Sequence, residues 1–337
     1  MNDSLSSRLD RVIDDTDFSG VVHIARAERI LYSRARGLAD RARGVPNTLD
    51  TQFAIASGTK GLTALAVMSL VAEGRLALDA TVESVLEGAG DLVDPAVTVR
   101  HLLAHTSGMG DYLDEGAIAD IEDHVLEVPV HRLASPADFL PLLRGRSAKF
   151  QPGTRFAYCN SGYVLLALVI EAVSGRSYYD VVKERVSAPA GMLATAFLRL
   201  DTLPDTAAIG YLPNRGWRTN DAHVPVRGAG DGGAYATAGD MARLWRALFA
   251  GLIVPLATVT EIMRPQHQIA TKSHGYGLGF WLTDDGVFLE GFDPGISFRS
   301  TFKPSTGLLY SVFSNTTSGA WPIVKEFEAL LPDAQRP

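Results

Sequence analysis

The chain has 337 residues, of which 46% are hydrophobic and 20% charged, values typical of a globular protein with a sizeable core. Its 31 lysines and arginines against 38 aspartates and glutamates give a net charge of -7, which argues against nucleic acid or an anionic membrane as the main partner. A single cysteine excludes an internal disulfide framework, and no apolar run is long enough to span a bilayer.

The N-terminal part of the chain predicts a helix followed by a hairpin. Residues 1–20 contain no apolar core of the kind found in signal peptides, so a cytoplasmic location is expected. Residues 4–15 are typical of a short amphipathic helix. Residues 19–40 indicate two strands joined by a polar turn at 26–29.

The middle of the chain is mainly helical in its pattern. An apolar helix is predicted from Ser57 to about Gly74, and a short helix within 97–109 that Gly108 ends. Residues 111–150 are rich in loops. Two more helices are expected within 160–192 and another over 239–251.

The period of the pattern changes to two towards the C-terminus, which predicts successive strands over 276–284, 286–290, 296–304 and 307–315, before a last helix over 321–331. Strands at both ends with helices between them predict an α+β fold. One antiparallel sheet is built from both termini and flanked by helices, and a mainly helical lobe is inserted. We expect residues 1–57 and 225–337 to form the α/β lobe, residues 58–224 the helical lobe, and the active site to lie between them.

Ser57 and Lys60 form an S-x-x-K pattern at the start of the apolar helix. Positions i and i+3 share a face of a helix, so the Ser57 Oγ and Lys60 Nζ atoms can meet there. A helix that is apolar nearly all round must be buried, and a lysine in it loses hydration, which lowers its pKa. A neutral lysine amine can take the proton from a serine hydroxyl. The alternative is a lysine that extends to the surface, and the pattern also arises by chance.

Tyr158 and Asn160 flank Cys159 just before another apolar helix. A tyrosine near a lysine ammonium can have a lowered pKa and relay protons, and an asparagine amide offers both a donor and an acceptor. The alternative is a packed tyrosine followed by an asparagine that caps the helix.

Together these elements resemble the serine β-lactamase-like family, which includes class C β-lactamases, penicillin-binding proteins, esterases and D-aminopeptidases. The resemblance is carried by FAIASGTK, HLLAHTSGM, FQPGTRFAYCNSGY and GGAYATAGDMARL, and it extends from about Phe18 to Asn315. It implies that Ser57 is the acylated nucleophile, Lys60 its activating partner and Tyr158 a second proton-transfer group. Asn160 would hold Lys60 and the acyl side of the substrate.

The family's third motif is usually Lys-Thr-Gly or His-x-Gly on a strand, and the matching stretch here is FLEGFDPGISF. Glu290 then stands at the Lys/His position, Gly291 in the middle and Phe292 where glycine is usual. The backbone N–H groups of Ser57 and Asp293 would form the oxyanion hole, which a change of side chain does not remove. An ionised Glu290 is expected to repel a substrate carboxylate, and Phe292 to narrow the strand edge.

Three other features have ordinary explanations. The G-x-G-x-x-G match at 228–233 lacks a βαβ context and is expected to be a loop beside the active cleft. His101 and His105 are four residues apart but have no evident third metal ligand. Cys159 is expected to point into packing rather than to act as the nucleophile.

The sequence therefore predicts a serine hydrolase that acts through an acyl-enzyme on Ser57, most simply an esterase or a small amide or peptide hydrolase. A β-lactamase or D,D-peptidase is the alternative, and a catalytically silent binding protein is the alternative from another class. Neither a metal nor an organic cofactor is expected. The expected partner is a small-molecule ester, amide or peptide, and the sequence does not predict the oligomeric state.

Overall fold

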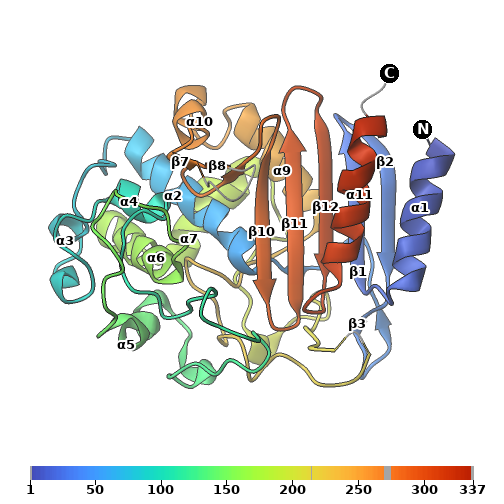
Figure 1. Ribbon diagram of the computed structural model, residues 1–337, viewed down its shortest axis with the longest axis horizontal. Coiled ribbons are helices and arrows are strands. Elements are labelled where there is room, and N and C mark those ends of the chain that lie inside the picture. The colour runs from blue at the N-terminus through green and yellow to red at the C-terminus, as the bar shows by residue number, and fades with distance from the viewer. Residues whose placement is uncertain (1, 214, 269–274, 335–337) are drawn as a thin grey trace.

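The computed structural model describes residues 2–213, 215–268 and 275–334, and its centre is an eight-stranded antiparallel sheet (Figure 1). The strand order is β2-β1-β12-β11-β10-β9-β8-β7, so the N-terminal hairpin pairs with the C-terminal strands. The sheet strands are β1 (Gly20–Arg26), β2 (Arg29–Arg36), β7 (His267–Gln268), β8 (Gly275–Tyr276), β9 (Trp281–Leu282), β10 (Val287–Asp293), β11 (Ile296–Lys303) and β12 (Leu308–Ser314). Two small sheets pair β3 (Leu38–Asp40) with β4 (Val45–Pro46), and β5 (Phe53–Ala54) with β6 (Tyr235–Ala236).

The helices cover both faces of this sheet, and several of them lie on the β10 side of the molecule, away from β1 and β2 (Figure 1). Their bounds are α1 (Asn2–Asp15), α2 (Thr59–Ala72), α3 (Val82–Val85), α4 (Val99–Leu103), α5 (Leu140–Leu143), α6 (Asn160–Ser174), α7 (Tyr178–Val182), α8 (Ala188–Ala190), α9 (Ala238–Phe249), α10 (Leu256–Ile262) and α11 (Ala320–Ala334). No helix among the described residues is long and apolar enough to cross a membrane.

The alternation of strand side chains divides the core into two clusters. Val21 of β1 belongs to the large cluster that also contains α2, α6 and α9. Its neighbours Val22 and Ile24 face the smaller cluster made with α1 and α11. The sheet is therefore covered on both faces, and the α+β class with a sheet built from both termini is confirmed.

Helices α2 and α6 are the most deeply buried elements. Residues Thr59–Leu70 of α2 and Asn160–Ile170 of α6 are all buried. A helix with no solvent-facing side must be packed all round, as its sequence predicts. Because polar groups open both helices, the chain places Lys60 and Asn160 inside the protein. The lobe boundaries after residues 57 and 224 stay a prediction.

Two predicted elements are wrong in detail. Helix α4 ends at Leu103, well before Gly108, because His105 has a φ of 56° that a right-handed helix cannot accommodate. His101 and His105 therefore do not share a helix. Residues 276–284 do not form one continuous strand. They hold the end of β8, a turn in which Gly277 N–H donates to Phe280 O (2.9 Å), and β9.

Candidate active site

Ser57 lies in a 3₁₀ turn, Ala56–Gly58, between strand β5 and helix α2. The turn is anchored where the Ile55 N–H donates to Ala234 O at 2.9 Å. Ala56 has a φ of 43°, a left-handed conformation that is strained for a residue with a side chain. Ser57 is half-buried at the point where the chain turns sharply into α2.

The Lys60 side chain is 1% exposed and its Nζ atom has three close oxygen neighbours. They are Ser57 Oγ at 2.8 Å, Asn160 Oδ1 at 2.8 Å and the Asp231 carbonyl oxygen at 2.7 Å. Burial lowers the pKa of Lys60, while the carboxylates of Asp231 and Glu115 act in the opposite direction. In the neutral amine, two N–H groups would satisfy the two carbonyl oxygens, and the lone pair would face the Ser57 hydroxyl.

Asn160 is held by contacts that fix the orientation of its amide. Its Nδ2 donates to Leu113 O at 2.8 Å and to Asp111 Oδ2 at 3.3 Å, so Oδ1 faces Lys60. Asp111 also accepts from the backbone N–H groups of Asn160 and Ser161, both at 2.8 Å, and so caps α6. The idea that the Asn160 side chain is itself the helix cap is therefore wrong.

Tyr158 lies beside the lysine, with its ring centroid 4.9 Å from Lys60 Nζ and its ring stacked on Trp281. The pKa of Tyr158 is raised well above its ordinary value, first by burial and then by the charge of Glu115. A hydrogen bond with the Ser57 side chain lowers it but does not prevail. The lowered tyrosine pKa expected from the sequence is thus wrong, because burial raises it. A neutral phenol can still donate its proton.

Cys159 and His105 support the site without reaching into it. Cys159 is a free, buried thiol, as expected from packing. Its backbone N–H donates to His105 Nδ1 at 3.1 Å, and His105 Nε2 lies 3.2 Å from the Tyr276 hydroxyl. Both ring nitrogens are thus engaged within the protein. No group of three or more metal-ligating side chains is found in the described part of the chain.

At Gly291, strand β10 packs against the residues that precede Ser57. A Cβ atom on Gly291 would lie 2.0 Å from Ile55 O and 3.0 Å from Ala56 Cβ, so the strand needs a glycine here. Successive strand residues alternate faces, so the side chains of Glu290 and Phe292 point away from that contact.

Glu290 and Phe292 both have neighbours on the α11 side of the sheet. Glu290 forms an ion pair with Arg299 of β11, which also pairs with Glu328 of α11 at 3.3 Å. Its charge is therefore offset, and it does not stand alone before the substrate. The Phe292 ring centroid lies 6.2 Å from that of Trp321 on α11, and Phe292 also lines a pocket at Ser57, so its narrowing of the strand edge stays a prediction.

Carboxylates gather near the lysine. The Tyr112 hydroxyl donates a hydrogen bond to Asp231 Oδ2 at 2.5 Å, and burial raises the pKa of Asp231. The pKa of Asp293 is raised to about 7, by burial and by the charges of Glu115 and Asp231. Apart from Lys60, the groups that act on Asp293 are therefore acidic.

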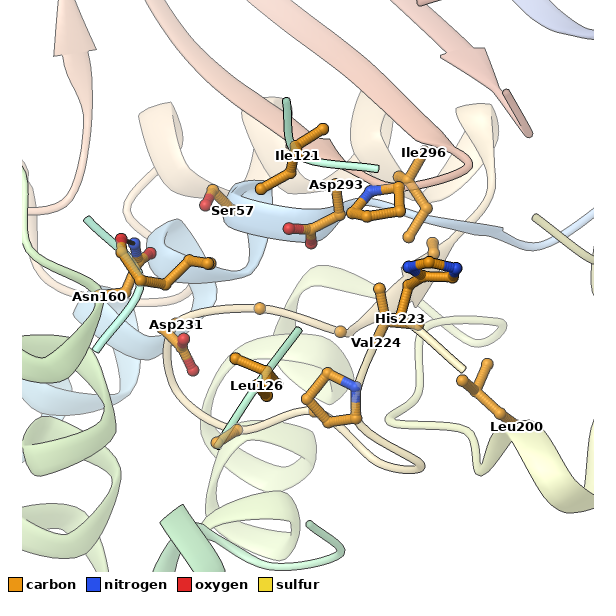
Figure 2. Close-up of a pocket in the computed structure, with 18 of the residues that line it drawn as sticks. Ser57, Ile121, Leu126, Asn160, Leu200, His223, Val224, Asp231, Asp293 and Ile296 are labelled. Carbon is orange, nitrogen blue, oxygen red and sulfur yellow. Dashed lines mark hydrogen bonds between the residues drawn. The ribbon is translucent and has the colours of Figure 1, made fainter. Parts of the chain in front are cut away.

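Two hollows meet at Ser57. The first, which we call the long pocket, runs from Ser57 to His223 and Leu200 (Figure 2). Its Ser57 end is polar and its middle is apolar, and its lining includes Asn160, Asp231, Asp293, Ile121, Leu126, Val224 and Ile296. The second, which we call the tyrosine pocket, is lined by Ser57, Glu115, Phe156, Tyr158, Trp281, Glu290, Gly291 and Phe292.

The structure brings together all eight candidate residues, but sequence reasoning missed several of their supports. Asp111 and Glu115 lie in the loop-rich stretch, where no pattern marks them. Asp231 belongs to the glycine-rich loop at 228–233, which lines the long pocket as expected. The glycine-rich loop could have drawn attention to Asp231. Its contact with Lys60 could not be predicted from the residue type, because the backbone carbonyl of Asp231 makes it.

The comparisons with known proteins agree with this arrangement. The Beta-lactamase family model matches residues 7–332. The chain is 33% identical to esterase EstB of Burkholderia gladioli over 321 residues, which cover 82% of this chain and 79% of that protein. It is 30% identical to the D-aminopeptidase of Brucella anthropi over 66% of this chain, and spans 41% of that protein.

A crystal structure of a penicillin-binding protein from Bacillus halodurans superposes with a TM-score of 0.89 and 38% identity. The superposition covers 96% of this chain and 99% of the penicillin-binding protein chain. The strained serine turn, the buried lysine and the match along nearly the whole chain lead to one conclusion: this protein belongs to the β-lactamase family of serine hydrolases.

Proposed function

We propose that the protein hydrolyses small esters or amides through an acyl-enzyme formed on Ser57. The observation that carries this proposal is the set of three oxygen atoms around Lys60 Nζ. Two of them are carbonyl oxygens that can only accept hydrogen bonds, so the neutral amine has its lone pair free for Ser57. Burial favours this neutral form.

In the first half-reaction Lys60 takes the hydroxyl proton as Ser57 Oγ attacks the substrate carbonyl carbon. The oxyanion would be bound by the backbone N–H groups of Ser57 and Asp293. Tyr158, as a neutral phenol, would donate a proton to the leaving group as the bond to it breaks. Water then attacks the acyl-enzyme as the Tyr158 phenolate takes a proton from it, the acid is released, and Lys60 returns its proton to Ser57 Oγ.

The two hollows fit the two parts of such a substrate. Tyr158 lines the tyrosine pocket, so the leaving group would lie there. The long pocket starts at the same serine and would take the acyl group. Because carboxylates surround the serine, neutral or cationic acyl groups should be preferred over anionic ones.

The test is a fluorophosphonate probe followed by mass mapping of the adduct. We expect labelling at Ser57, loss of labelling in Ser57→Ala with an unchanged melting temperature, and normal labelling in the control Ser318→Ala, an exposed serine. An adduct on Cys159, or none with either a phosphonate or a penicillin probe, would overturn the assignment.

A further inference from the structure

The carboxylate of Asp293 has no partner of its own. Among the described residues it accepts no hydrogen bond and forms no ion pair, although Asp231, Glu290 and Asp111 nearby all do. It nevertheless lines the long pocket, and Figure 2 shows it pointing into the space between Ser57 and Asp231. A carboxylate held in a mainly apolar pocket without a partner is costly, so the site is prepared for a positive group.

The carboxylate is also close enough to serve a group attached next to the reacting carbonyl. A Cβ atom on Gly232 would lie 3.9 Å from Asp293 Oδ2 and 3.8 Å from the Ala56 carbonyl carbon, which is bonded to Ser57 N. One small group at that point would therefore touch both Asp293 and the nucleophile's backbone. A substituent on the carbon beside the scissile carbonyl spans such a distance.

The pocket also limits the size of the acyl group. The cavity volume of the long pocket is about 70 Å³. One water molecule needs about 10–15 Å³ of cavity volume, so the long pocket has room for about five waters or for a short apolar chain. The apolar middle of the pocket, at Leu126 and Val224, would receive that chain.

We propose that Asp293 binds a protonated amine on the acyl group, so that the preferred substrates carry an ammonium group beside the scissile carbonyl and a short apolar side chain. This inference rests on the acyl transfer proposed above. It makes Asp293 a specificity-determining residue through its side chain, in addition to any role of its backbone N–H.

Binding of such a cation has a consequence for Lys60. The groups that face Lys60 are the carboxylates of Asp231, Glu115, Asp293 and Asp111, the Tyr158 and Tyr163 rings, and buried His105. The four carboxylates raise the lysine pKa, against burial. An ammonium bound at Asp293 offsets part of their charge, so it favours the neutral lysine that the reaction needs.

The experiment compares the methyl esters of D- and L-leucine with two uncharged relatives, methyl 4-methylpentanoate and N-acetyl-leucine methyl ester. At pH 7.5, above the Asp293 pKa of about 7 and near that of an α-amino group, we expect kcat/KM for the better leucine enantiomer to exceed that for methyl 4-methylpentanoate by at least about 10-fold, the effect of one good charge-assisted contact. In Asp293→Asn this ratio should fall at least about 5-fold. In the control Asp284→Asn, an exposed aspartate before β10, it should not change.

The ratio cancels any general loss of activity in the Asp293 variant. The pH dependence of kcat gives a second readout: its acidic limb should lie at lower pH for leucine methyl ester than for methyl 4-methylpentanoate, and the difference should shrink in Asp293→Asn. Equal kcat/KM ratios in wild type and Asp293→Asn would overturn the inference about Asp293. If the esters were still hydrolysed in that case, the proposed acyl transfer on Ser57 would stand. Failure of every ester together with failure of Ser57 labelling would overturn both.

Discussion

Asn160 Oδ1 accepts a hydrogen bond from Lys60 Nζ at 2.8 Å, and so joins the first turn of α6 to the first turn of α2 across 100 residues of chain. The contact is directional because Asn160 Nδ2 is already bound to Leu113 O. It leaves the third position on Nζ for Ser57. The proposed reaction therefore depends on two helix starts that only the fold brings together.

Lys60→Met should separate catalysis from stability. The substitution removes a buried amine but leaves Asn160 Oδ1 and the Asp231 carbonyl oxygen without their donor, so the free energy of unfolding should fall by only about 1–3 kcal/mol and the protein should stay folded. The turnover of a p-nitrophenyl ester should fall at least about 10²-fold, the low end for loss of a positioned proton-transfer group. The control is Lys183→Met, an exposed lysine. Near wild-type turnover in Lys60→Met would mean that Lys60 is not the base.

Asp293→Asn should stabilise the protein in a pH-dependent way. The folded pKa of Asp293 is about 7, above its ordinary value of 3.8, so the folded state binds more protons between these values. The free energy of unfolding therefore decreases as pH rises from about 4 to about 7 because of this group, and levels off above. An asparagine at position 293 does not titrate, so the variant does not have this decrease in the free energy of unfolding. Its gain in melting temperature over wild type should be larger at pH 8 than at pH 5.

The raised pKa of Asp293 arises from burial and from the charges of Glu115 and Asp231, which together outweigh the opposing charge of Lys60. Thermal unfolding of wild type, Asp293→Asn and the exposed control Asp284→Asn at both pH values checks it. An equal gain at pH 5 and pH 8 would show that Asp293 keeps an ordinary pKa.

Gly291→Ala should destabilise the contact between β10 and the serine turn. The added methyl group would lie 2.0 Å from Ile55 O, which is backbone and cannot move aside without shifting the turn. We expect a loss of about 1–3 kcal/mol or more, together with a loss of activity. In the matched variant Gly232→Ala the nearest atoms lie at 3.8 Å, so the melting temperature should hardly change. If both variants melted alike, the close approach of β10 would not be real.

Anionic β-lactams should be poor substrates, but Glu290 should not be the main cause. A unit charge at about 4 Å contributes about 4 kcal/mol at an effective dielectric near 20, yet Arg299 offsets the charge of Glu290. Glu290→Gln should therefore change the ratio of kcat/KM for nitrocefin to that for p-nitrophenyl acetate by less than about 3-fold.

The wild-type ratio itself should be low, because Asp231, Asp293 and Glu115 remain near the serine. Kinetics with both substrates in wild type and Glu290→Gln test this. Efficient nitrocefin hydrolysis by the wild type would contradict the acidic character of the site. A large rise in the nitrocefin ratio in Glu290→Gln would show that the charge of Glu290 acts on the substrate.

The sequence by itself determined the elements and the residue types of the site. Apolar runs that begin at Ser57 and Asn160 predict buried helices whatever surrounds them, since such helices have no polar face to leave in water. Alternation over residues 286–315 likewise predicts three strands. S-x-x-K and Tyr-x-Asn are local patterns, so they could be found without knowledge of the fold.

Only the tertiary structure decided what lies beside these residues, because contacts between distant parts of a chain leave no local pattern. The end of α4 at Leu103 follows from the left-handed backbone of His105, which its tertiary contacts with Cys159 and Tyr276 hold in place. The raised pKa of Tyr158 follows from burial, which no neighbour in sequence reveals. Arg299 comes to face Glu290 through the register of β10 and β11, and the same pleat places the Phe292 side chain on the α11 side. Among the described residues the Asp293 carboxylate has no hydrogen-bond partner, and this too is decided by the fold, which places the acidic Glu115 and Asp231 beside it.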